Sequence, residues 1–302
     1  AAAAAGTPPR VGAIDASALM TRAERPRSDM NSPVARGRHV PPDDAAAPMD
    51  DDEHDLGEEV DDDDDDDDSA GDFDPYLFMK HLPPKSSACR EGWDAAHPRL
   101  PPREAGDARR VTLVLDLDET LVHSQMEPRA EADFVFDVQL CGVTSTVYAT
   151  ARPRLDAFLD YASRKFEVVI FTASHQAYAE TLLDRIDPGR TRIDHRLFRD
   201  ACATVDGLYL KDLDVLGRDL SRVAIVDNTP YVFGFQPDNA VPIESWYDDP
   251  ADRELDELRG LLDRLAAAPD VRPVLIDAFH LRDRIADADP GDLDMVDGAY
   301  PA

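Results

Sequence analysis

Three short apolar segments constrain the fold of this chain more than any other feature of its sequence. They span residues 111–115, 168–171 and 223–226, and none of them alternates between apolar and polar residues. Uninterrupted runs of this length are typical of strands buried on both faces of a parallel sheet. Helical apolar spacing follows Pro153 and resumes at about Ser174. Strands that alternate with helices predict a doubly wound α/β fold, with helices on both faces of a parallel sheet.

Two stretches rich in β-forming residues lie between the first apolar segment and Pro153. They cover residues 133–140 and 144–151, and a Cys-Gly pair separates them. This pattern predicts a small β-hairpin inserted after the first strand. Farther along, residues 251–266 and 271–285 carry helical apolar spacing, so we expect two helices at the end of the domain.

Much of the formal net charge of −31 is concentrated near the N-terminus. Residues 43–74 contain nineteen acidic residues and no Lys or Arg, including an unbroken Asp run at 61–68. Such a segment has too few apolar side chains to form a core. We therefore expect a disordered acidic tail at 1–75, a Pro-rich linker or docking strap at 76–108, a globular domain at 109–286 and a flexible C-terminus at 287–302.

Composition also bears on partners and location. No stretch approaches the roughly 18 apolar residues that a membrane span needs. Three widely spaced cysteines favour a reducing compartment over a disulfide or zinc framework. The acidic balance disfavours direct nucleic-acid binding, whereas the Asp run could serve as a docking arm for basic proteins or as a mimic of a phosphorylated segment. We expect a monomer in the nucleus or the cytoplasm.

Polar side chains follow each of the three buried segments. Asp116, Asp118 and Thr120 come directly after the first, Thr172 after the second and Asp227-Asn228 after the third, with Lys211 between the last two. Because the carboxyl ends of parallel strands meet at one edge of a sheet, we expect these groups to converge.

The convergent residue types suit phosphoryl transfer. Asp116, Asp118, Asp227 and Asn228 offer hard oxygen ligands for Mg²⁺, and this many acids would repel one another without a cation. Lys211 supplies positive charge, and the turn at Thr172 is a common place for anion binding. A carboxylate that attacks phosphorus forms an aspartyl-phosphate, and an acid two residues away can protonate the leaving oxygen and then activate water.

Four motifs resemble those of the haloacid dehalogenase superfamily in their order: DLDET at 116–120, FTAS at 171–174, YLKDL at 209–213 and VDNTP at 226–230. More narrowly, VLDLDETLVHS, VVIFTASHQAYAETLLD and FQPDNAVPIESWYDD resemble the small CTD phosphatases over about residues 111–265. Those enzymes remove phosphate from the C-terminal repeats of RNA polymerase II and from some other phosphoproteins.

The resemblance implies a role for each matched residue. It implies that Asp116 is the nucleophile and a Mg²⁺ ligand, and that Asp118 is the general acid/base whose backbone carbonyl binds the metal. It further implies that Thr172, Lys211 and Arg199 contact the phosphate. Asn228 would be a metal ligand, and Asp227 would hydrogen-bond to a water molecule bound to the metal.

Two features indicate the reaction and the substrate. Asp118 favours hydrolysis, since superfamily members that must keep the aspartyl-phosphate lack an acid there. Between Thr120 and Pro153 there is too little chain for a full cap domain, and an open site suits a phosphorylated side chain on a polypeptide. We therefore predict a Mg²⁺-dependent phosphoserine/phosphothreonine phosphatase, with Phe134 and Phe136 in contact with the peptide.

Other interpretations of the same residues stay open. A catalytically silent phosphatase-like receptor or scaffold is the main alternative, and the intact set of acids with Lys211 argues against it. A small-metabolite phosphatase is disfavoured by the short insertion. Thr172 could also cap a helix, and Arg199 could form a surface salt bridge. We expect structural roles for His123, His175, Glu119, Trp246 and Phe235.

Overall fold

The computed structural model describes residues 73–88, 98–103, 106, 109, 111–140 and 143–289. The predicted acidic tail up to residue 72 and the C-terminal segment from residue 290 lie outside these residues. Within the described ranges, no helix is both long and apolar enough to cross a membrane.

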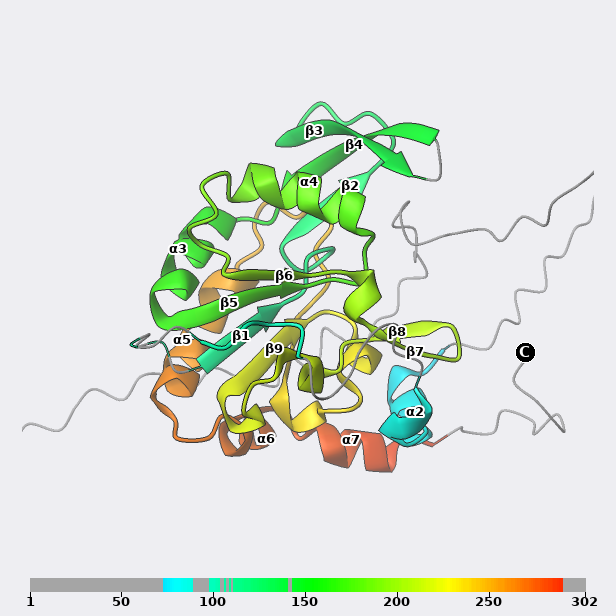
Figure 1. Cartoon of the computed structure of the whole chain (residues 1–302), viewed down its shortest axis with the longest axis vertical. Coiled ribbons are helices and arrows are strands. Elements are labelled where there is room, and N and C mark those ends of the chain that lie inside the picture. The colour runs from blue at the N-terminus through cyan, green and yellow to red at the C-terminus, as the bar shows by residue number, and fades with distance from the viewer. Residues whose placement is uncertain are drawn as a thin grey trace, which may run out of the picture.

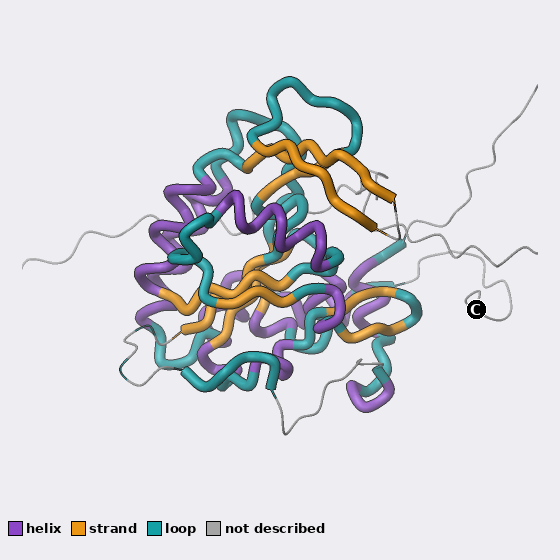
Figure 2. Tube along the Cα trace, turned by 45° about the horizontal axis from the view of Figure 1, so that its top comes forward, coloured by secondary structure: helices purple, strands orange, loops and turns teal. Residues whose placement is uncertain are grey.

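A five-stranded parallel sheet forms the centre of the domain (Figures 1 and 2). Its order is β10-β9-β1-β5-β6. Every residue of β1, β5 and β9 is buried, as the apolar segments predicted. The doubly wound α/β fold is therefore confirmed. The strands are β1 (Val111–Leu115), β5 (Phe166–Phe171), β6 (His195–Leu197), β9 (Val223–Asp227) and β10 (Ala240–Pro242).

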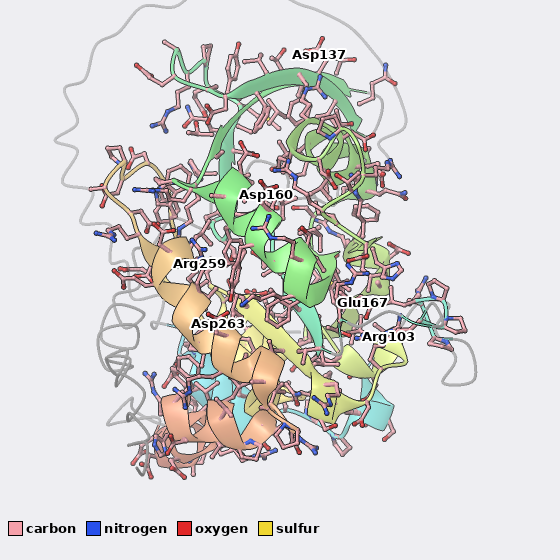
Figure 3. All side chains as sticks on the ribbon, turned by 90° about the vertical axis from the view of Figure 1, so that its left-hand side faces the viewer. Arg103, Asp137, Asp160, Glu167, Arg259 and Asp263 are labelled. Carbon is pink, nitrogen blue, oxygen red and sulfur yellow. The ribbon has the colours of Figure 1, made fainter. Side chains whose placement is uncertain are left out.

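Helices flank this sheet, and two of them lie side by side in Figure 3, where Asp160 marks α3 and Arg259 and Asp263 mark α5. The Tyr161 hydroxyl of α3 donates to Asp263 of α5. The single helix predicted at 271–285 is wrong, because the chain turns at His280, whose φ of 49° lies in the left-handed region. The helices are α3 (Leu155–Lys165), α4 (Gln176–Ile186), α5 (Glu254–Ala267), α6 (Arg272–Phe279) and α7 (Leu281–Asp287).

The insertion after β1 forms a separate antiparallel sheet at the top of Figure 1. The predicted hairpin is confirmed as β3 (Phe134–Leu140) and β4 (Val143–Ala151). A third strand, β2 (Val122–Gln125), pairs with β4 and was not predicted. Its four residues are too few to show a clear alternation.

The Pro-rich segment before the domain contains a short helix, α2 (Pro75–Lys80), which Asp74 caps by accepting from two backbone N–H groups. This helix packs against α7 and against the 3-10 turn η5 (Pro230–Phe233), and Met79 belongs to the main core cluster. The remaining short elements are η1 (Lys85–Ser87), η2 (Arg199–Ala201), β7 (Ala203–Val205), β8 (Leu208–Leu210), η3 (Leu213–Leu216), η4 (Leu220–Arg222) and η6 (Pro237–Asn239).

Candidate active site

The parallel register of the central sheet brings the predicted residues to one edge. β1 pairs with β5 on one side and β9 on the other, so Leu115 lies opposite both Ile170 and Val226. Asp116 extends this pairing, because its backbone N–H donates to the Val226 carbonyl at 3.0 Å. Asp227 is the last residue of β9 and therefore lies beside Asp116.

Lys211 connects these two carboxylates. Its Nζ lies 2.5 Å from Asp116 Oδ1 and 2.5 Å from Asp227 Oδ2. Burial alone would lower the pKa of the Lys211 ammonium, but the two carboxylates hold it above its usual value. Burial raises the pKa of Asp227 to about 7, although Lys211 opposes this shift. One ammonium thus faces two buried acids.

Asp118 lies in a second hydrogen-bonded group at the same edge. Ser174 Oγ donates to its Oδ2 at 2.6 Å, and the Tyr178 hydroxyl donates to its Oδ1 at 2.5 Å. Ser124 Oγ lies 2.7 Å from the Tyr178 oxygen. Burial, assisted by the charge of Glu119, raises the pKa of Asp118 to about 7 despite these hydrogen bonds. A carboxyl poised near neutral pH is suited to both giving and taking a proton.

Thr172 and Arg199 border the same turn. Thr172 Oγ1 accepts from the Ser174 N–H at 2.9 Å within the turn and lies 3.5 Å from Asp118 Oδ2. Thr172 is not the helix cap that the alternative interpretation expected, because His175 is the N-cap of α4 and accepts from the Ala177 N–H. Arg199 donates from Nε to the Ala173 carbonyl at 2.7 Å, and its guanidinium stands 5.0 Å from the Tyr209 ring centre. Arg199 is therefore held beside the Thr172 turn.

Asn228 is oriented by neighbours on both sides of its amide. Thr120 Oγ1 donates to its Oδ1 at 3.1 Å, and its Nδ2 donates to Ser245 Oγ at 2.9 Å. These contacts fix the amide oxygen, the atom that a hard cation would bind.

The residue set fits a magnesium ion by charge and by ligand chemistry. In the part of the chain that the structure describes, no three His, Cys, Asp or Glu side chains converge as a complete metal cage. Mg²⁺ does not need such a cage, because it keeps several waters and is held by one or two carboxylates plus substrate phosphate. Asp116 and Asp227 share the one ammonium of Lys211, so a cation at this edge would meet carboxylate oxygens that a single positive charge serves.

Sequence reasoning assigned no role to Ser174, Tyr178 or Ser124, which surround Asp118. A signal was present, because Ser174 and Tyr178 are four residues apart where a helix begins and can therefore face the same way. The expected roles of His123 and Trp246 agree with their contacts: His123 Nδ1 lies 3.1 Å from Glu119 Oε1, and Trp246 is buried.

A groove of about 550 Å³ lies between β3 and the first turns of α4, and its lining includes His175, the residue after Ser174 in the sequence. Phe136 does not line it: this side chain is buried and stacks on Tyr178 with ring centres 6.2 Å apart. The expectation that Phe136 contacts a peptide is therefore wrong for this conformation, because the ring is used for packing. The groove is lined by Asp137, Val138, Gln139, His175, Gln176, Ala177, Glu180 and Thr181.

Comparisons with known proteins identify the family to which the chain belongs. The family model "NLI interacting factor-like phosphatase" matches residues 111–272. "CTD small phosphatase-like protein 2" of Dictyostelium discoideum is 46% identical over 217 residues, which cover 72% of this chain and 37% of that protein. "CTD small phosphatase-like protein 3" of Caenorhabditis elegans is 39% identical over 238 residues, 76% of this chain and 81% of that protein.

A human relative, "Carboxy-terminal domain RNA polymerase II polypeptide A small phosphatase 1", is 46% identical over 177 residues, 58% of this chain and 67% of that protein. The chain spans only 37% and 53% of the lengths of two Dictyostelium relatives. The family match covers more than half of the sequence and contains Asp116, Asp118, Lys211 and Asp227. This chain belongs to the family of NLI interacting factor-like phosphatases.

Proposed function

We propose that this protein is a Mg²⁺-dependent phosphoserine/phosphothreonine phosphatase that acts through an aspartyl-phosphate on Asp116. The observation that carries the proposal is that Asp116 and Asp118 lie at the same edge of the sheet but have different neighbours. Asp116 contacts the Lys211 ammonium at 2.5 Å, whereas Asp118 two residues later is held by Ser174 and Tyr178. One acid is therefore set beside positive charge, and the other is set to exchange protons.

In the first step, an Asp116 carboxylate oxygen forms a bond to phosphorus while the bond from phosphorus to the serine or threonine oxygen breaks. Protonated Asp118 gives its proton to that leaving oxygen. In the second step, Asp118 takes a proton from a water molecule that attacks the aspartyl-phosphate, which releases phosphate and restores Asp116. A pKa of about 7 lets Asp118 serve in both directions.

The remaining residues bind the phosphoryl group. Lys211, Thr172 and Arg199 are proposed to neutralise and orient its oxygens. Asp116, the Asp118 backbone carbonyl, Asp227 and Asn228 would hold Mg²⁺, with Asp227 acting through a metal-bound water. When bound, the ion would stabilise the negative charge that develops on the transferred group.

The substrate class follows from the surroundings of the site. The groove between β3 and the start of α4 is open, which suits a polypeptide better than a metabolite that must be enclosed. The human relative is named as a phosphatase of the RNA polymerase II carboxy-terminal domain. We therefore propose phosphopeptides of that kind as substrates and the nucleus as one place of action.

A phosphopeptide panel that includes polymerase-tail repeats tests the proposal. Phosphate release would be measured with Mg²⁺ and after chelation with EDTA, for the wild-type chain and for Asp116→Asn. We expect turnover that depends on Mg²⁺ and falls at least about a thousandfold in the variant. Activity that survives Asp116→Asn would refute the mechanism. Peptide binding without turnover by the wild-type chain would support the scaffold alternative, and a preference for small phosphate esters would refute the proposed substrate class.

A further inference from the structure

A segment outside the matched family region contacts both loops that complete the site. We name it the N-terminal strap and define it as residues 73–88. The family model begins at residue 111. The strap nevertheless packs on η5, which begins two residues after Asn228, and it reaches the turn after Lys211. In Figure 1 its helix α2 lies beside α7 and below the β7–β8 hairpin.

The first contact is apolar and covers the loop after Asp227. Phe73 and Phe78 each meet the Tyr231 ring edge-on, with centres 5.6 Å and 5.8 Å away. Strap side chains also close over Gly234: a Cβ built at that position would lie 2.4 Å from Leu82 Cδ1 and 3.3 Å from Met79 Cγ. The loop from Pro230 to Gly234 is therefore packed tightly beneath the strap.

The second contact is ionic and reaches the residue next to Lys211. Asp212 is fully buried, and Lys85 Nζ of the strap lies 3.3 Å from its Oδ1 and 2.6 Å from Asp214 Oδ2. Gln236 Nε2 donates to Asp212 Oδ1 at 2.5 Å, while Gln236 Oε1 accepts from the Leu213 N–H at 3.2 Å. One hydrogen-bonded group thus joins the strap, the Lys211 turn and the end of the Asp227 loop.

We infer that the N-terminal strap is a positioning element of the catalytic site and that Lys85 is its positioning residue, acting through Asp212 on Lys211. The inference rests on the proposed function, because it assigns a role within that reaction. A buried carboxylate is stabilised by a nearby positive charge, and Lys85, which lies outside the matched family region, places one beside Asp212. Removing Lys85 takes one cation away from the buried Asp212, which loosens the hydrogen-bonded group that fixes the backbone next to Lys211.

The size of the effect follows from the geometry at Lys211. Its Nζ contacts two carboxylates at 2.5 Å, so a small shift of its backbone changes both contacts. Displacements of about 1 Å in a catalytic constellation reduce rates by up to about a hundredfold. For a contact that acts through one intervening residue, we expect kcat to fall about tenfold with little change in KM.

Lys85→Ala in the full chain tests the inference, with Lys80→Ala as the matched control. Lys80 is on the same strap, but it donates to the Ala286 and Ala288 carbonyls at the end of α7, away from the site. Lys85→Arg serves as the rescue variant. For each chain, kcat and KM would be measured with a phosphopeptide, and amide hydrogen exchange would be followed over residues 209–216 and 229–236.

We expect Lys85→Ala to lower kcat about tenfold and to speed exchange in both windows, whereas Lys85→Arg and Lys80→Ala stay within about twofold of wild type. If Lys85→Ala and Lys80→Ala had equal effects, the strap would only stabilise the fold in general, and the inference would be overturned. Unchanged kcat and unchanged exchange in Lys85→Ala would overturn it as well. If the wild-type chain shows no phosphatase activity, the proposed function fails, while the exchange measurement still decides whether Lys85 holds the two loops.

Discussion

At the carboxyl end of the central sheet one buried ammonium faces two aspartates, whereas at the amino end one buried glutamate is surrounded by cations. Glu167, the second residue of β5, accepts from Arg218 at 2.7 Å and 2.9 Å, lies 3.0 Å from Arg103 and accepts from Thr112 at 2.7 Å. Figure 3 shows Arg103 and Glu167 at this end.

The two ends also differ in how their charges are balanced. Burial alone would raise the pKa of Glu167, but hydrogen bonds from His195, Arg218 and Thr112, with the charge of Arg103, lower it below its usual range. At the other end the pKa values of Asp118 and Asp227 both rise to about 7. The buried carboxylate at the amino end is thus matched by cations of the protein, whereas burial outweighs the local positive charge at the carboxyl end. We therefore expect the amino end to contribute stability and propose that the carboxyl end carries the chemistry.

The largest effect is expected at the carboxyl end, for Lys211→Met. This change leaves Asp116 and Asp227 buried without their shared ammonium, so we expect kcat to fall about a thousandfold and the free energy of unfolding to fall by about 3 kcal/mol. Phosphate release and urea unfolding measure the two effects. Lys165→Met is the matched control, because Lys165 forms an exposed pair with Asp263 and should change neither quantity appreciably. If Lys211→Met kept its activity, the carboxyl end of the sheet would not differ from the amino end in serving catalysis.

Glu167→Gln probes the amino end. It leaves Arg103 and Arg218 without their carboxylate, so we expect the free energy of unfolding to fall by about 3 kcal/mol at neutral pH, with kcat unchanged. Because the folded state lowers the pKa of Glu167, its contribution is present above the usual pKa of 4.5 and is lost as the pH falls through the folded-state value. Wild type and variant should therefore converge in denaturant unfolding at low pH. A parallel loss of kcat would show that the two ends are coupled.

Tyr178→Phe sharpens the description of the carboxyl end. The change removes the hydroxyl that donates to Asp118, so we expect kcat to fall about tenfold and the unfolding free energy by about 1 kcal/mol. Tyr161→Phe is a matched control, because its hydroxyl donates to Asp263 between α3 and α5. Steady-state kinetics should separate the two variants. If both lower kcat equally, Tyr178 acts through general stability and not through Asp118.

Glu254→Gln is expected to have the smallest effect and tests whether a raised pKa alone marks a catalytic residue. Burial raises the pKa of Glu254, at the start of α5, to about 7. A raised carboxyl pKa favours folding below the usual value of 4.5, and this contribution is lost as the pH rises through 7. We expect the variant to be more stable than wild type by about 1 kcal/mol at mildly alkaline pH, with unchanged kcat. Urea unfolding of this variant and of exposed Glu257→Gln measures the difference, and a loss of activity would contradict a purely structural role.

The sequence was informative where local pattern and long-range geometry agree. The apolar runs correctly predicted the buried strands. Because β1 and β9 pair in parallel, Asp116 and Asp227 at their carboxyl ends lie side by side. For Lys211 the sequence predicted a position near the two acids but not the contact with each of them. Lys211 follows a three-residue strand, which is too short to show a periodic pattern.

Other features depend on tertiary packing. Glu167 stands inside an apolar strand, and its cations come from segments that flank β1 and β9, so no local pattern connects them. The strap contacts were also missed, since a Pro-rich segment with scattered aromatics has no periodic apolar face. Lys85 and Asp212 are 127 residues apart, and only the folded chain brings them together.

The central claim is that Asp116 carries the phosphoryl group and Asp118 moves the proton. Asp118→Asn with p-nitrophenyl phosphate tests it directly, because this leaving group departs without protonation while hydrolysis of the aspartyl-phosphate still needs a base. We predict a rapid stoichiometric burst of p-nitrophenol, slow turnover afterwards, and phosphate attached to Asp116 by mass spectrometry after rapid quenching. Absence of a burst together with unmodified Asp116, or phosphate on another residue, would contradict the account.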